Sequence, residues 1–76
     1  MNFKEDIKRQ ANGYREIGRF FSRNWPNGNG DNQLAANAHY QAADLLLTLD
    51  FLSAQNAIKD TAQWQRKYSD LVVALN

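Results

Sequence analysis

The sequence contains no cysteine, a single proline and a single histidine, and its formal net charge is only +1. The absence of cysteine excludes disulfides and cysteine-based metal sites, and one histidine is a poor basis for a structural zinc site. No apolar run approaches the roughly 18 residues needed to cross a membrane. The charged N-terminus, MNFKEDIKRQ, also lacks the apolar segment of a secretory signal. These absences predict no metal, no cofactor, no membrane association and a cytoplasmic location.

What is present suits one small domain spanning residues 1–76. Hydrophobic residues make up 43% of the chain and charged residues 22%, which is typical of a globular protein and too apolar for disorder. Chains of this length bury only about 60–65% of their unfolded surface. Their stability therefore depends on good helix packing or on association between copies.

The segment 34–52, LAANAHYQAADLLLTLDFL, has the composition of a helix with two apolar stripes on nearly opposite sides. One stripe consists of Leu34, Ala38, Ala42, Leu45, Leu49 and Leu52. The other consists of Ala36, Tyr40, Ala43, Leu47 and Phe51. A helix that is apolar on two faces has to be covered on two faces. We therefore expect this helix to lie between two partners with both stripes buried, and His39 to lie on a polar edge between them.

A first helix is predicted over residues 3–24. Its apolar face consists of Phe3, Ile7, Ala11, Tyr14, Ile17, Gly18 and Phe21. A neighbouring polar stripe, called the basic stripe below, consists of Lys4, Lys8, Asn12, Arg15, Arg19 and Arg23. Gly18 lies on the apolar face, where a close approach of another helix would explain it. Gly13 lies off that face, and the sequence offers no reason for it.

A loop at residues 25–31 follows, because Pro26 ends the helix and the Asn-Gly pairs favour turns. Asp31 is the expected N-cap of a second helix over residues 32–52. Ser53 is the expected cap of a third helix over residues 54–75. The alternative is one continuous helix over residues 32–75, which would have to dimerise to cover its faces. The favoured fold is an all-α three-helix bundle, an antiparallel helical hairpin with a third helix, associating as a dimer.

No pattern of residues supports catalysis. There is no cysteine nucleophile, and the positions one turn from His39 are Ala35 and Ala43 instead of serine or a carboxylate. The run NGNGDNQ lacks the glycine and glutamate that a calcium loop requires at its sixth and twelfth positions. It also lacks the Lys-Ser/Thr of a phosphate-binding loop. The chain is therefore predicted not to be an enzyme and to have no catalytic, cofactor-binding or metal-binding residues.

The charge distribution is uneven, which makes the first helix the candidate surface for a macromolecular partner. Residues 1–25 carry six basic and three acidic residues, whereas residues 26–76 carry three basic and five acidic residues. The candidate partner-binding residues are Arg15, Arg19, Phe20, Arg23 and Trp25. Arginines with an adjacent aromatic residue dominate many protein interfaces, so an acidic protein partner is favoured. A solvated helix face, with Trp25 as a lid on the core, is the alternative that requires no partner.

The predicted function is that of a small non-catalytic regulator, adaptor or inhibitor of a protein partner. Compact proteins of this kind are common among bacterial and phage regulators. The alternative is a nucleic-acid-binding protein that uses the basic first helix, although the long Gly-rich connection does not fit a helix-turn-helix. The expected homodimer interface consists of Tyr40, Leu47, Phe51, Trp64 and Tyr68.

Overall fold

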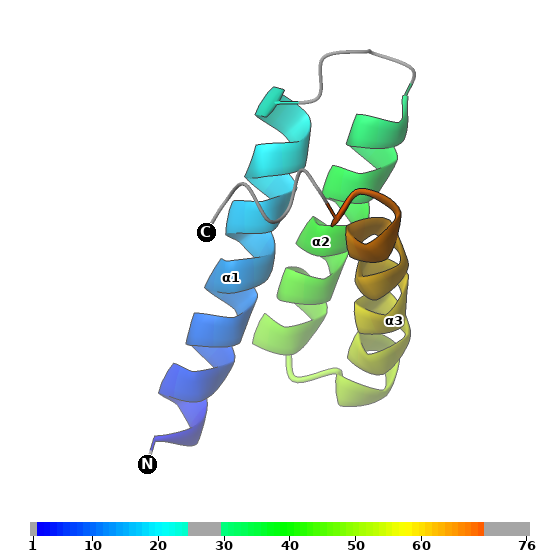
Figure 1. Ribbon diagram of the computed structural model, residues 1–76. Helices are drawn as coiled ribbons and strands as arrows, with labels where there is room; N and C mark the ends of the chain where they lie inside the picture. The colour runs from blue at the N-terminus through cyan, green and yellow to red at the C-terminus, as the bar shows by residue number, and fades with distance from the viewer. Residues whose placement is uncertain (1, 25–29, 70–76) are drawn as a thin grey trace.

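The computed structural model describes residues 2–24 and 30–69 of the chain and shows three helices there. They are α1 (Phe3–Asn24), α2 (Asp31–Leu47) and α3 (Phe51–Lys67), as Figure 1 shows. The part of the chain that the structure describes contains no strand. Trp25 and the expected last turns of the third helix, residues 70–75, lie outside the described residues.

Helix α2 is the centre of the fold. Both α1 and α3 pack against it, while α1 and α3 make few contacts with each other. In Figure 1, α1 and α3 flank α2, and α2 runs antiparallel to both neighbours. The predictions of an all-α three-helix bundle and of a second helix covered by two partners are therefore confirmed.

The core around α2 is built mainly from small side chains. Its buried residues are Ala35, Ala36, Ala38, His39, Ala42, Ala43 and Leu46. The prediction that both apolar stripes would be buried is wrong for several large residues, because Leu34 is 57% exposed, Leu49 55% and Leu52 81%. Leu49 and Leu52 escape burial because α2 ends at Leu47. The alanines let the neighbouring helices pack close to the α2 backbone.

Helices α1 and α2 approach each other closely at Gly18. A Cβ atom added there would lie 2.9 Å from Tyr40 Cε1 and 3.3 Å from the Ala36 carbonyl oxygen. The expected close helix approach at Gly18 is therefore confirmed. At Gly13, by contrast, an added Cβ would meet no atom within 4 Å.

The second and third helices are separate, but the break lies earlier than predicted. The Leu49 N–H donates to the Leu46 carbonyl and the Asp50 N–H donates to the Leu45 carbonyl, while Leu49 has a φ of 63°. This pattern is a Schellman motif, with leucine at the left-handed position that glycine usually occupies. The expected cap, Ser53, is instead the third residue of α3. Its N–H donates to Oδ1 of Asp50, the actual N-cap, over 3.3 Å.

The predicted N-cap of the second helix is also displaced by one residue. Gly30, with a φ of 91°, occupies the N-cap position, and Asp31 is the first residue of α2. The Asp31 carboxylate instead accepts a hydrogen bond from the Tyr68 hydroxyl at 2.7 Å and lies 3.6 Å from Lys67 Nζ. Asp31 therefore ties the end of α3 to the start of α2, and its charge also suits the N-terminal helix dipole.

Candidate interaction surfaces

His39 is fully buried, so the prediction that it lies on a polar edge of the central helix is wrong. Its Nδ1 lies 2.7 Å from the Ala35 carbonyl oxygen, and its Nε2 lies 3.1 Å from Nε2 of Gln65 on α3. Because a carbonyl oxygen only accepts, Nδ1 carries the proton and Nε2 accepts from the Gln65 amide. Burial lowers the pKa of His39, against the opposing effects of the Ala35 hydrogen bond and the Asp60 charge. His39 is thus a neutral core residue covered by α3.

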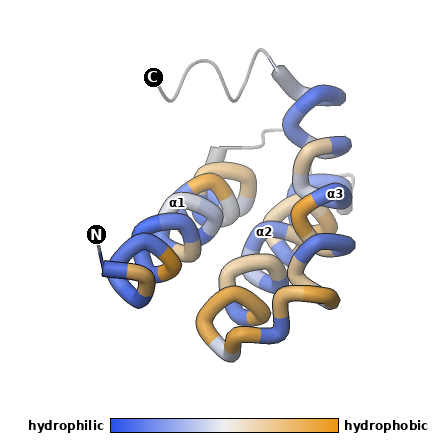
Figure 2. Tube along the Cα trace, turned by 90° about the horizontal axis from the view of Figure 1, so that it is seen from below, coloured by the Kyte–Doolittle hydropathy of each residue, from blue (hydrophilic) through white to orange (hydrophobic). Residues whose placement is uncertain are grey.

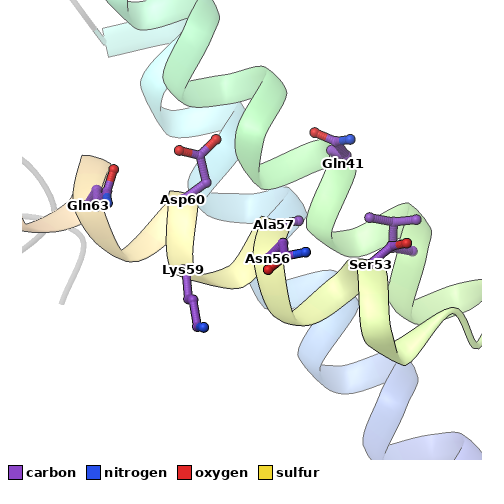
Figure 3. A pocket seen from close by; sticks show the side chains of 8 residues that line it. Gln41, Ser53, Asn56, Ala57, Lys59, Asp60 and Gln63 are labelled. Atoms are coloured by element: carbon purple, nitrogen blue, oxygen red, sulfur yellow. The ribbon is translucent and has the colours of Figure 1, made fainter.

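A pocket of about 520 Å³ lies between α2 and α3. Its lining is formed by Gln41, Leu45, Ser53, Asn56, Ala57, Lys59, Asp60 and Gln63. Figure 3 shows Gln41 coming from α2, with the side chain of Lys59 directed away from α2. Ser53 and Asp60 are seven residues apart on α3, which is about 10 Å of helix rise, so they do not form a nucleophile–base pair. The pocket offers amide and hydroxyl groups for hydrogen bonding.

The basic stripe lies along α1, and its members differ in what they contact. Arg15 is half-buried, and its Nη2 lies 3.5 Å from Oδ1 of Asp44 on α2. Arg19 and Arg23 are exposed, and within residues 2–24 and 30–69 neither forms an ion pair. The same holds in this part of the chain for Lys4 and Lys8. Arg15 thus contacts α2 within the fold, whereas the other cations of the stripe face solvent.

Phe20, the aromatic candidate next to these arginines, takes part in internal packing. Its side chain is half-buried, and its ring lies edge-on to the buried Phe21 at a centroid distance of 6.2 Å. Trp25, the last candidate of this group, lies outside the described residues. The structure therefore brings the arginines of the predicted surface together on α1 without showing Phe20 as a freely available anchor.

The five residues of the expected dimer interface fall into two groups. Tyr40, Trp64 and Tyr68 are half-buried and pack against the core cluster of Phe21 and its alanine neighbours. The Trp64 and Tyr68 rings stack with centroids 6.1 Å apart and an interplanar angle of 8°. Leu47 and Phe51, in contrast, are 37% and 41% exposed at the other end of the bundle.

Around Leu47 and Phe51 lies a surface that we call the apolar end patch. It consists of Phe3, Leu47, Leu49, Phe51 and Leu52. Figure 2 views the molecule from this end and shows apolar residues gathered around the α2–α3 turn. The Phe3 and Phe51 rings lie 6.1 Å apart, joining α1 to the patch.

The apolar end patch also contains a small hollow. A pocket of about 160 Å³ is lined by Lys4, Ile7, Lys8, Leu47 and Leu49. The basic stripe therefore begins at the edge of the patch. Sequence reasoning missed Phe3, Leu49 and Leu52 as surface residues because their apolar spacing placed them on buried helix faces.

The chain has no match among protein-family models, curated proteins or solved structures. Over residues 2–24 and 30–69, no three histidine, cysteine or acidic side chains come together as a metal site. No helix in these ranges combines the length and apolar character needed to cross a membrane. The surfaces themselves are therefore the basis for proposing a function.

Proposed function

We propose that this protein is a non-catalytic regulator, adaptor or inhibitor that binds an acidic protein partner through the basic stripe of α1. The observation that carries the proposal is the exposure of Arg19 and Arg23, one turn apart and without an ion pair in the described part of the chain. Guanidinium groups present paired N–H donors that match the two oxygens of a carboxylate. An acidic protein surface therefore suits this pair.

The extent of the basic stripe supports a macromolecular partner over a small ligand. Helix α1 has 22 residues, which corresponds to about 33 Å of helix. Exposed cations stand near both of its ends, with Lys4 and Lys8 at one and Arg19 and Arg23 at the other. A partner that contacts the whole stripe must itself present an extended surface.

Nucleic acid is the second candidate, because phosphates also attract these cations. Two acidic side chains lie near these cations: Asp44 lies beside Arg15 at 3.5 Å, and Glu16 is exposed on the same helix as the stripe. They would repel a phosphate backbone and an acidic protein surface alike, so the salt dependence of binding has to separate the two candidates. Phosphate contacts give a steep loss of affinity with salt that is shared by unrelated sequences, whereas a protein partner is expected to show a shallower dependence.

The test is affinity capture from lysate with and without nuclease treatment, comparing wild type with the double variant Arg19→Glu/Arg23→Glu. The control, Lys59→Glu/Arg66→Glu, makes the same change in net charge at exposed positions of α3. Captured proteins are identified by mass spectrometry, purified and rebound. An acidic protein that binds wild type and the control but not the α1 variant supports the proposal. Equal binding by both variants, or capture that depends on nucleic acid, contradicts it.

We also propose that the protein forms a homodimer. The exposed apolar residues at one end of the bundle support this, because a chain this short has few other ways to bury additional apolar surface. Of the residues expected at the interface, only Leu47 and Phe51 belong to that end. Sedimentation equilibrium across the micromolar range would contradict the dimer by returning the monomer mass of 8.7 kDa throughout.

A further inference from the structure

We infer that the apolar end patch is the docking site for a second copy of this chain, joined to the first end to end by a two-fold axis. This inference rests on the proposed homodimer and specifies its surface. The patch draws residues from the start of α1, the end of α2, the α2–α3 turn and the start of α3. It therefore depends on the folded arrangement of all three helices.

The exposed area fits a dimer. A leucine or aromatic side chain presents roughly 200 Å² when fully exposed. The exposed fractions of the five patch residues, from 37% at Leu47 to 81% at Leu52, then correspond to apolar area on the order of 500 Å². Two such patches facing each other would bury at most on the order of 1,000 Å², which is the lower limit for a specific protein interface. Rim residues would add to this area.

The charges at the rim favour a second copy over a partner of one charge sign. Lys4 and Lys8 line the small pocket of the patch, and Asp50 is exposed between Leu49 and Phe51. In a two-fold interface the same surface faces itself, so its charges have to be complementary to one another. A rim that carries both signs meets this condition, whereas a uniformly acidic partner would also face Asp50.

The backbone at the centre of the patch provides a second argument. Leu49 has a φ of 63°, a conformation that costs a leucine free energy but is tolerated by asparagine and glycine. Leu49 is also 55% exposed, so the burial of its side chain within one chain offsets little of this free-energy cost. Burial of Leu49 against a second copy accounts for a large apolar residue at this turn.

The experiment is sedimentation equilibrium of the full chain across the micromolar range for wild type, Leu52→Gln, Leu49→Asn and a control, Leu34→Gln. Leu34 is 57% exposed but lies in the first turn of α2, at the opposite end of the bundle. Circular dichroism melting shows whether each variant stays folded. Leu49→Asn protects the test against unfolding, because asparagine accepts the left-handed conformation more readily than leucine.

Wild type is expected to approach twice 8.7 kDa. Leu52→Gln and Leu49→Asn are each expected to raise the dimer dissociation constant by about tenfold or more, because two-fold symmetry removes each side chain twice. Leu34→Gln should leave it unchanged. A wild-type dimer that both patch variants preserve overturns the docking site while the proposed homodimer stands. Equal weakening by Leu34→Gln also overturns the site. A wild-type monomer at every concentration overturns both the docking site and the proposed homodimer.

Discussion

Gly18 offers the sharpest test of how α1 and α2 pack, because a second glycine on the same helix serves as its control. In Gly18→Ala the new Cβ would lie 2.9 Å and 3.1 Å from two Tyr40 ring atoms and 3.3 Å from the Ala36 carbonyl oxygen. Real Cβ atoms are essentially never found at the first of these distances, so the Tyr40 ring or the helix has to move. In Gly13→Ala the new Cβ meets no atom within 4 Å.

The two substitutions are expected to change the free energy of unfolding in different directions. Gly→Ala in a helix interior contributes up to about 1 kcal/mol through helix propensity, so Gly13→Ala should stabilise the protein. Gly18→Ala gains the same amount but also incurs an overpacking cost of about 1–3 kcal/mol. The variants should therefore differ by about 1–3 kcal/mol. In a domain of this size each kcal/mol shifts Tm by roughly 4–8 °C.

The assay is urea and thermal unfolding of both variants, followed by circular dichroism. In a Tyr40→Ala background the ring is gone, and the penalty of Gly18→Ala should shrink, which a double-mutant cycle measures. Equal stabilisation by Gly13→Ala and Gly18→Ala would refute the close approach of α1 and α2. If Gly18→Ala destabilises the protein equally in the Tyr40→Ala background, the contact with the Tyr40 ring is not the cause of the destabilisation.

Two further predictions concern His39 and the α2–α3 turn. Burial lowers the pKa of His39 in the folded protein below the ordinary value of 6.5, so the unfolded chain binds the proton more readily. The free energy of unfolding should therefore fall as pH drops through about 6.5 towards the folded pKa. Urea titrations at several pH values should show this fall in wild type and not in His39→Gln. The same fall in His39→Gln would show that His39 is not its cause. At the turn, Asp50→Ala should destabilise by about 0.5–2 kcal/mol as an N-cap loss, whereas Ser53→Ala should stay within about 0.5 kcal/mol. A larger loss of stability in Ser53→Ala than in Asp50→Ala, measured by thermal melting, would show that Ser53 is the N-cap.

The helical periodicity of the sequence was sufficient to predict the three-helix fold and the central place of α2. It also identified Gly18 as a contact point, because a glycine on an apolar helix face leaves room for a neighbouring helix to come close. The helix end at Leu47 could not be predicted in this way, since a leucine in the left-handed position carries none of the usual glycine or asparagine signal. That one position moved the break and exposed Leu49 and Leu52.

The candidate surfaces were predicted less completely for related reasons. The periodicity of its own helix puts His39 on a polar edge, and it cannot show that Gln65 and α3 cover that edge. Asp31 resembled an N-cap locally, but its hydrogen bond to Tyr68 spans 37 positions in the sequence. The spacing of Arg19 and Arg23 on α1 required only the helical period, and the structure places both in solvent.

The most direct test of the proposed function is arginine-selective covalent labelling, read by mass spectrometry, with and without the acidic protein that affinity capture identifies. Arg66 on α3 is exposed and serves as an internal control within the same molecule. The proposal predicts that the partner protects Arg19 and Arg23 from modification while Arg66 stays fully reactive. Unchanged reactivity of Arg19 and Arg23 in the complex would show that the partner binds elsewhere and would contradict the basic stripe as the binding surface.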